Sequence, residues 1–367
     1  MTHETASSLL TPYTSGPLRL ANRIVMAPMT RLRADENGVP LPIVADYYAQ
    51  RAGAGLIVTE GIWPGFTGQS LWRQPGLVTE EQVAAWRRVT EAVHTAGGVI
   101  FAQLMHGGRA AHPLTRVDGG WPLAPSAVPL PGPQHTREGM REPVVPKAMT
   151  GRDIAETVED FARAARNAVR AGFDGVELHG ANSYLIHQFL ADNTNLRTDA
   201  YGGDVPGRIR FAREAVEAVA DAVGPHRTAV RLSPGNPQSG IVEADPGPVY
   251  RTLAAALAPL GLAYAHLTES SDYPALADLR PLLGGTVIAN VGENHDPTDR
   301  AAGEAVLRRG VADLVSYGRA FLANPDLPRR FATGAPTTRP DTALLYTHGP
   351  EGYTDHPAAL PAPTLAR

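Results

Sequence analysis

Short apolar segments rich in β-branched residues alternate along the chain with longer segments of helical periodicity. The expected strands cover residues 24–29, 56–59, 99–104, 176–178, 229–232, 264–268, 287–290 and 314–316. The expected helices cover residues 42–52, 80–96, 151–171, 208–223, 248–258, 274–283, 298–309 and 325–331. Eight strand–helix alternations predict an α/β fold, a closed (β/α)8 TIM barrel; a doubly wound open sheet with extra strands is the alternative.

The helix after the third strand is delayed. Residues 107–149 are rich in proline and glycine and lack helical periodicity, and the chain after residue 334 is also proline-rich. An excursion of this length, leaving a barrel strand at its carboxyl end, is typical of a lid or a binding loop. No near-identical repeat or low-complexity tract suggests a second domain, so we expect one barrel domain over residues 1–367.

Composition and charge exclude several classes of function. The formal net charge is −4 without a basic run, so we expect no nucleic-acid or membrane partner. The absence of cysteine excludes disulfides, thiolate nucleophiles, Cys-ligated zinc and iron–sulfur clusters, and we expect no bound metal. With neither a signal-peptide pattern nor a long apolar span, we expect a cytoplasmic location, as a monomer or a homodimer.

Polar residues stand where buried strands end. Each of them alone has an ordinary explanation, such as a satisfied core amide or a salt-bridged arginine. As a set, they would meet at one rim of the barrel, where they suit a large, flat, polar heterocycle that carries a phosphate. The set comprises Thr30, Glu60, Gln103, His106, His179, Asn182, Arg231, Asn290 and Arg319.

The phosphate end of such a ligand is expected at the last two strands. In many barrels the loops after strands seven and eight bind a phosphate, because glycines let backbone N–H groups approach the anion. Arg319 could bind the phosphate with two parallel hydrogen bonds. The residues at these loops are Asn290, Val291, Gly292, Gly318 and Arg319.

Several segments occur in the order found in one flavoenzyme family. They are 22–31 (NRIVMAPMTR), 179–185 (HGANSYL), 188–190 (QFL), 195–203 (NLRTDAYGG), 231–234 (RLSP), 318–319 (GR) and 352–355 (GYTD). Together they resemble the Old Yellow Enzyme family, and its bacterial N-ethylmaleimide reductase and pentaerythritol tetranitrate reductase type in particular. The resemblance extends over roughly residues 9–358.

The resemblance implies an FMN-dependent ene-reductase that takes electrons from NAD(P)H. Thr30 would hydrogen-bond the flavin O4, and Gly61 would let the backbone approach the isoalloxazine ring, although it could also be a plain turn glycine. Gln103 would contact the pyrimidine edge, and Arg231 would lie near N1 and O2. The other implied cofactor contacts are Pro28, Met29, Asn290, Val291, Gly292, Gly318 and Arg319.

On the substrate side, the resemblance implies that His179 and Asn182 bind the oxygen of an activated alkene and that Tyr184 protonates the α-carbon of that alkene. The alkene would be an α,β-unsaturated carbonyl compound, a maleimide or a nitroalkene. Tyr346 and Met105 would line the pocket, and Met105 stands where relatives often carry tryptophan. Trp72 could either line the pocket or pack against it.

Three alternatives remain open at this stage. Asn182 could be a helix N-cap with Tyr184 as a core residue beneath it. The chain could be a flavin-free, phosphate-binding lyase or isomerase, although its only lysine, Lys147, lies in the excursion rather than on a strand. It could also be a non-catalytic protein that retains a flavin site.

Overall fold

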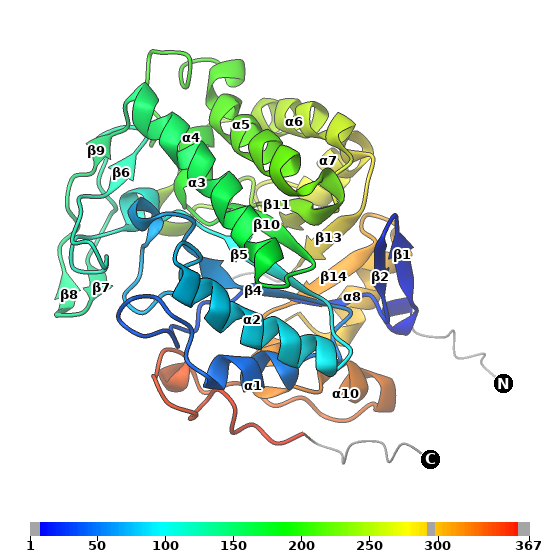
Figure 1. The fold of residues 1–367 in the computed structure, drawn as a ribbon. Coiled ribbons are helices and arrows are strands. Elements are labelled where there is room, and N and C mark those ends of the chain that lie inside the picture. Colours follow the sequence, from blue (N-terminus) through cyan, green and yellow to red (C-terminus); the bar gives the residue numbers. More distant parts are fainter. Residues whose placement is uncertain (1–7, 292–297, 359–367) are drawn as a thin grey trace.

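Eight parallel strands close into a barrel in the computed structural model, which describes residues 8–291 and 298–358 (Figure 1). Their order around the barrel is β10-β11-β12-β13-β14-β3-β4-β5. This arrangement confirms the predicted (β/α)8 barrel over the open sheet. The strands are β3 (Ile24–Met26), β4 (Leu56–Ile62), β5 (Ile100–Leu104), β10 (Gly175–Gly180), β11 (Thr228–Leu232), β12 (Tyr264–Thr268), β13 (Val287–Asn290) and β14 (Leu314–Tyr317).

Helices surround the barrel, as Figure 1 shows. Capping boxes at Thr79 and Thr150 fix the starts of the second and third helices, because each threonine exchanges hydrogen bonds with the third helical residue. No helix in the described part of the chain is long and apolar enough to cross a bilayer. The helices that follow the strands are α1 (Ile43–Ala49), α2 (Glu80–Thr95), α3 (Gly151–Arg170), α5 (Val205–Val223), α6 (Pro246–Leu257), α7 (Ala275–Leu283), α8 (Arg300–Arg308) and α10 (Leu327–Thr333).

Two strands end three residues away from the sequence-based expectation, which is the largest difference among the eight. The first strand ends at Met26 rather than at residue 29, so residues 27–30 cross the barrel mouth as irregular chain. The second strand continues to Ile62 through a register shift between Val58 and Gly61. A β-bulge of this kind redirects a strand next to a functional site. The short helices α4 (Leu185–Leu190) and α9 (Arg319–Ala323) were not predicted, because each is too short to show helical periodicity.

A hairpin of β1 (Tyr13–Ser15) and β2 (Leu18–Leu20) closes the amino end of the barrel. Leu18 and Leu20 belong to the apolar cluster that fills the lower interior, together with Val25, Val58, Phe101, Tyr264, Ile288 and Leu314. The hairpin was not predicted from the sequence, because strands of three residues are too short to show alternation. With the lower interior sealed, the upper interior is left for polar side chains.

After a single 3-10 turn at Gly108–Ala110, the excursion that follows β5 forms two small sheets. β6 (Leu123–Ala124) pairs with β9 (Lys147–Ala148), and β7 (Gln134–Thr136) forms a hairpin with β8 (Gly139–Arg141). They lie together on one flank of the barrel (Figure 1). The carboxyl-terminal tail packs against α1 instead, where the rings of Tyr353 and Tyr47 stack with centroids 4.0 Å apart.

Shortening a buried leucine side chain of the β1–β2 hairpin will destabilise the barrel. Leu20→Ala removes a buried side chain, and we expect it to lower the free energy of unfolding by about 2–4 kcal/mol. Leu196→Ala is the matched control, since the side chain of Leu196 is 62% exposed and its loss leaves no cavity. Thermal and urea unfolding of both variants measure the difference, and equal stabilities would show that the hairpin is not part of the core.

Candidate active site

One cavity of about 670 Å³ opens at the carboxyl ends of the barrel strands. This volume lies within the range of sites for small molecules and cofactors. Most of the residues singled out in the sequence line it: Pro28, Met29, Thr30, Gly61, Gln103, Met105, His179, Asn182, Tyr184, Arg231, Arg319 and Tyr346, with Trp72.

The predicted phosphate residues are placed differently. Asn290, Val291 and Gly318 do not line this cavity, and Gly292 lies outside the described residues. Asn290 supports the cavity from below, because its Oδ1 accepts a hydrogen bond from Arg231 Nη2 at 3.2 Å. Arg319 lines both this cavity and an adjoining one of about 710 Å³, to which Arg300, Arg330 and Arg339 contribute.

Beneath the cavity, a chain of buried polar side chains connects strands of the barrel. Gln103 donates to Glu177, and Glu177 is hydrogen-bonded to His266. His266 is also hydrogen-bonded to Ser316, and Ser316 accepts a hydrogen bond from Asn290. Asn290 in turn accepts one from Arg231. Sequence analysis missed Glu177 and His266, although a carboxylate two residues before His179 in a buried strand signals an inward-facing partner.

His179 is a neutral hydrogen-bonding group at this site. Burial lowers the pKa of His179 well below its usual value, and the charge of Arg231 lowers it further. A neutral imidazole carries one N–H donor and one acceptor nitrogen. The residue can therefore donate to a ligand oxygen without bringing a positive charge into the cavity.

A strained turn at Asn182 and Ser183 brings Asn182 and the following Tyr184 to the cavity wall. Both residues have left-handed backbone, with φ of 53° and 67°. The turn is tied on both sides, because Asn182 N donates to Ser233 Oγ at 2.9 Å and Ser183 N to His187 Nδ1 at 3.1 Å. Two adjacent non-glycine residues in this conformation are costly and persist only where surrounding contacts enforce them.

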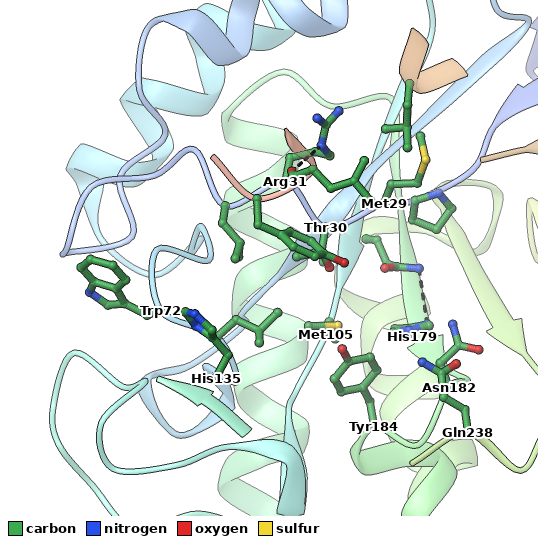
Figure 2. A pocket seen from close by; sticks show the side chains of 18 of the residues that line it. Met29, Thr30, Arg31, Trp72, Met105, His135, His179, Asn182, Tyr184 and Gln238 are labelled. Carbon is green, nitrogen blue, oxygen red and sulfur yellow. Dashed lines mark hydrogen bonds between the residues drawn. The ribbon is translucent and has the colours of Figure 1, made fainter. Parts of the chain in front are cut away.

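The turn places Tyr184 next to His179, with ring centroids 5.2 Å apart (Figure 2). The alternative of an Asn182 cap is wrong, because the N-cap of α4 is Tyr184 and no side chain caps it. Burial raises the pKa of Tyr184 to about 12, with a further contribution from Tyr346. Its hydroxyl therefore keeps its proton at neutral pH.

The mouth segment with Thr30 is held by a buried carboxylate. Glu60 Oε2 accepts hydrogen bonds from the backbone N–H groups of Arg31 at 2.9 Å and Leu32 at 3.0 Å. Leu32 has a left-handed φ of 59°, which these bonds stabilise. Since the strand ends at Met26, Thr30 lies on this irregular segment rather than on the strand itself.

Gly61 lies within β4 rather than in a turn. A Cβ atom there would come within 2.6 Å of Met105 Sδ and 3.0 Å of Met105 Cβ, so the Met105 side chain would have to move to make room for it. The plain turn glycine considered from the sequence is therefore wrong.

Buried arginines attach the tail to the cavity wall. Arg31 donates to the carbonyl of Gly352 at 2.6 Å, and Arg33 donates to that of Leu345 at 2.8 Å. These bonds fix the tail segment that carries Tyr346 and His348 over the cavity.

Other lining residues come from segments whose sequence gave no signal. His135 belongs to the β7–β8 hairpin of the excursion, and Gln238 belongs to a short 3-10 turn after β11. Figure 2 shows His135 beside Trp72, on the opposite side of the cavity from His179 and Asn182. The remaining residues that sequence analysis missed are Arg31, Leu32, Leu71, Leu322, Leu345 and His348.

Relieving the strained turn will stabilise the protein. Ser183→Gly removes the Cβ that disfavours positive φ, and we expect a gain of about 1 kcal/mol in the free energy of unfolding. Ser183→Ala is the control, because it removes the hydroxyl and keeps the Cβ. Thermal unfolding compares the two, and an equal effect of both substitutions would contradict a conformational origin.

Comparison with known proteins gives extensive similarity. Residues 8–338 match the model of the NADH:flavin oxidoreductase / NADH oxidase family. Chanoclavine-I aldehyde reductase fgaOx3 of Penicillium roqueforti is 43% identical, with 95% of this chain and 96% of that protein covered. A probable flavin mononucleotide-dependent alkene reductase of Leishmania infantum is 40% identical, with 95% and 97% covered. The structure of an old yellow enzyme homologue from Zymomonas mobilis superimposes with a TM-score of 0.91 at 41% identity, covering 95% of this chain and 99% of that one.

Proposed function

The chain belongs to the Old Yellow Enzyme family of NADH:flavin oxidoreductases, and from this we propose that it is an FMN-dependent, NAD(P)H-dependent reductase of activated alkenes. The observation that carries the proposal is the set of donors that surrounds one cavity at the barrel mouth. They lie there on separate strands and loops and include the amide of Gln103, the guanidinium groups of Arg231 and Arg319, the hydroxyl of Thr30 and the imidazole of His179.

The cavity fits FMN in its donor chemistry. Gln103 turns its amide nitrogen toward Glu177, which leaves Oε1 to accept from a ring N–H. Arg231 Nε is buried and has no hydrogen-bond partner among the described residues, so a bound ring acceptor could use it. Thr30 offers a hydroxyl at the mouth, and Arg319 connects the cavity to the arginine-lined space where a phosphate is expected. When bound, FMN supplies the hydride chemistry that couples oxidation of NAD(P)H to reduction of the alkene.

The substrate side of the cavity can stabilise negative charge on an oxygen. His179 and Asn182 donate hydrogen bonds to the carbonyl or nitro oxygen of the alkene, where charge accumulates as a hydride adds to the β-carbon. The Tyr184 hydroxyl then gives its proton to the α-carbon. Met105 and Tyr346 bound the space in which the substituents of the alkene lie. The substrates are α,β-unsaturated carbonyl compounds, maleimides or nitroalkenes.

A flavin-free lyase or isomerase that uses a Schiff-base lysine is disfavoured. Lys147 is exposed in β9 of the excursion and does not line the cavity.

Replacing the proton donor will slow alkene reduction. Tyr184→Phe keeps the ring and removes the acid, so we expect the rate constant for alkene reduction to fall at least about 100-fold. Tyr201→Phe is the control, since its hydroxyl bonds Glu214 outside the cavity. Single-turnover reaction of pre-reduced enzyme with 2-cyclohexen-1-one measures both, and unchanged turnover in Tyr184→Phe would show that another group supplies the proton.

The same step will be nearly independent of pH between 6 and 9. Tyr184 loses its proton only as the pH rises through a pKa of about 12, and His179 gains one only far below its usual pKa. We therefore expect the rate constant to change by less than about threefold across this range. A fall with an apparent pKa near 8 to 9 would contradict the assigned protonation states.

The absorbance spectrum of the purified protein tests the cofactor assignment. Purified protein should absorb near ~450 nm, lose this band anaerobically on addition of NADH or NADPH, and regain it when cyclohexenone is added. A colourless protein that cannot be reconstituted with FMN would rule the proposal out.

A further inference from the structure

Glu177 lies at the centre of the buried polar chain but takes no part in the reaction described above. Its side chain is fully buried on β10, directly opposite Gln103 of β5 in the parallel register. One carboxylate oxygen accepts from Gln103 Nε2 at 2.8 Å, and the other is 2.9 Å from His266 Nδ1. A buried carboxylate is costly unless both oxygens are paired, as they are here.

The charge state of Glu177 follows from its neighbours. Burial alone raises the pKa of this carboxyl group, but His266, the Arg231 guanidinium and the Gln103 amide lower it to below its usual value. The group is therefore an anion at neutral pH, and an ionised carboxylate can only accept hydrogen bonds.

An acceptor at this position decides which end of the Gln103 amide faces the cavity. The amide must turn its NH2 group toward Glu177, and its oxygen then remains on the cavity side. The second hydrogen of the same NH2 group lies toward His179, whose Nδ1 is 3.4 Å away. Because an amide nitrogen cannot accept, Nδ1 must carry the lone pair, and the imidazole proton resides on Nε2.

We propose that Glu177 is a positioning residue that sets the direction of the hydrogen bonds from the barrel interior to the cavity. It holds Gln103 with the amide oxygen outward, and through Gln103 it holds His179 as the Nε2–H tautomer. His266 and Ser316 support the carboxylate from the other side, where His266 Nε2 lies 2.9 Å from Ser316 Oγ.

The consequence for catalysis rests on the proposed function. His179 as the Nε2–H tautomer presents a donor to the oxygen of the bound alkene. The opposite tautomer presents a lone pair there and repels the same oxygen as it gains charge. Gln103 with its amide reversed would likewise present a donor to a ring N–H, which is also a donor.

The tautomer can be measured without any cofactor. Long-range ¹H–¹⁵N spectra of histidine-labelled, FMN-free protein show which ring nitrogen carries the proton, and the loss of one signal set in His179→Asn assigns that residue. We expect His179 of the wild type to carry its proton on Nε2. A proton on Nδ1 in the wild type overturns the proposal, whatever any variant does.

Glu177→Gln then tests the cause. The substituted amide can present either an acceptor or a donor to Gln103, so the direction of the bonds is no longer imposed. We expect the single His179 signal to be replaced by the Nδ1–H form or by a mixture of the two. Thr90→Val is the matched control, because Thr90 is also buried and its hydroxyl donates to Ala171 O at 2.6 Å, away from the cavity.

The loaded enzyme supplies a second measurement. In Glu177→Gln we expect the rate constant for enone reduction to fall at least about tenfold and the dissociation constant for FMN to rise about tenfold. Thr90→Val should change neither, even if it lowers the melting temperature as much. An unchanged tautomer with a Glu177→Gln enzyme that behaves like Thr90→Val would overturn the proposal. If the wild type binds no FMN, the proposed function fails, but the ring spectra still decide the role of Glu177.

Discussion

The site depends on the parallel register of the barrel strands. Since side chains two residues apart share a face, Glu177 and His179 both point inward from β10. Their register partners are Gln103 on β5, opposite Glu177, and Arg231 on β11, opposite His179, and both therefore face the same interior. A shift of one residue in any of these strands would turn its polar group outward and leave the others with buried, unpaired atoms. The strand register therefore determines both whether the buried polar groups of the upper interior are paired and which groups face a bound ligand.

Much of the fold was predictable because its signals are local. The strands Tyr264–Thr268 and Val287–Asn290 were predicted with the bounds that the structure gives, since short apolar runs stand out between helices. The residues at the strand ends were also predictable, because all strands of a parallel barrel end at one rim. Gln103, His179 and Arg231 meet there for that reason.

The remaining features depend on tertiary contacts that no local pattern carries. Leu18 and Leu20 form a plug only because the hairpin folds beneath the barrel, and their three-residue strands show no alternation. His135 lines the cavity because the excursion folds back as a hairpin. The left-handed turn at Asn182 and Ser183 is held by hydrogen bonds to two side chains. One is Ser233, which follows β11, and the other is His187 on α4. The effect of this turn on the direction of Tyr184 could not be predicted from spacing alone.

A crystal structure of the protein with its bound flavin would test this arrangement of the barrel interior directly. We expect the isoalloxazine ring at the barrel mouth, with Gln103 Oε1 and Arg231 Nε within hydrogen-bond distance of its edge, and with the Gln103 nitrogen still bonded to Glu177. A ring bound elsewhere, or one that turns Gln103 away from Glu177, would contradict this arrangement.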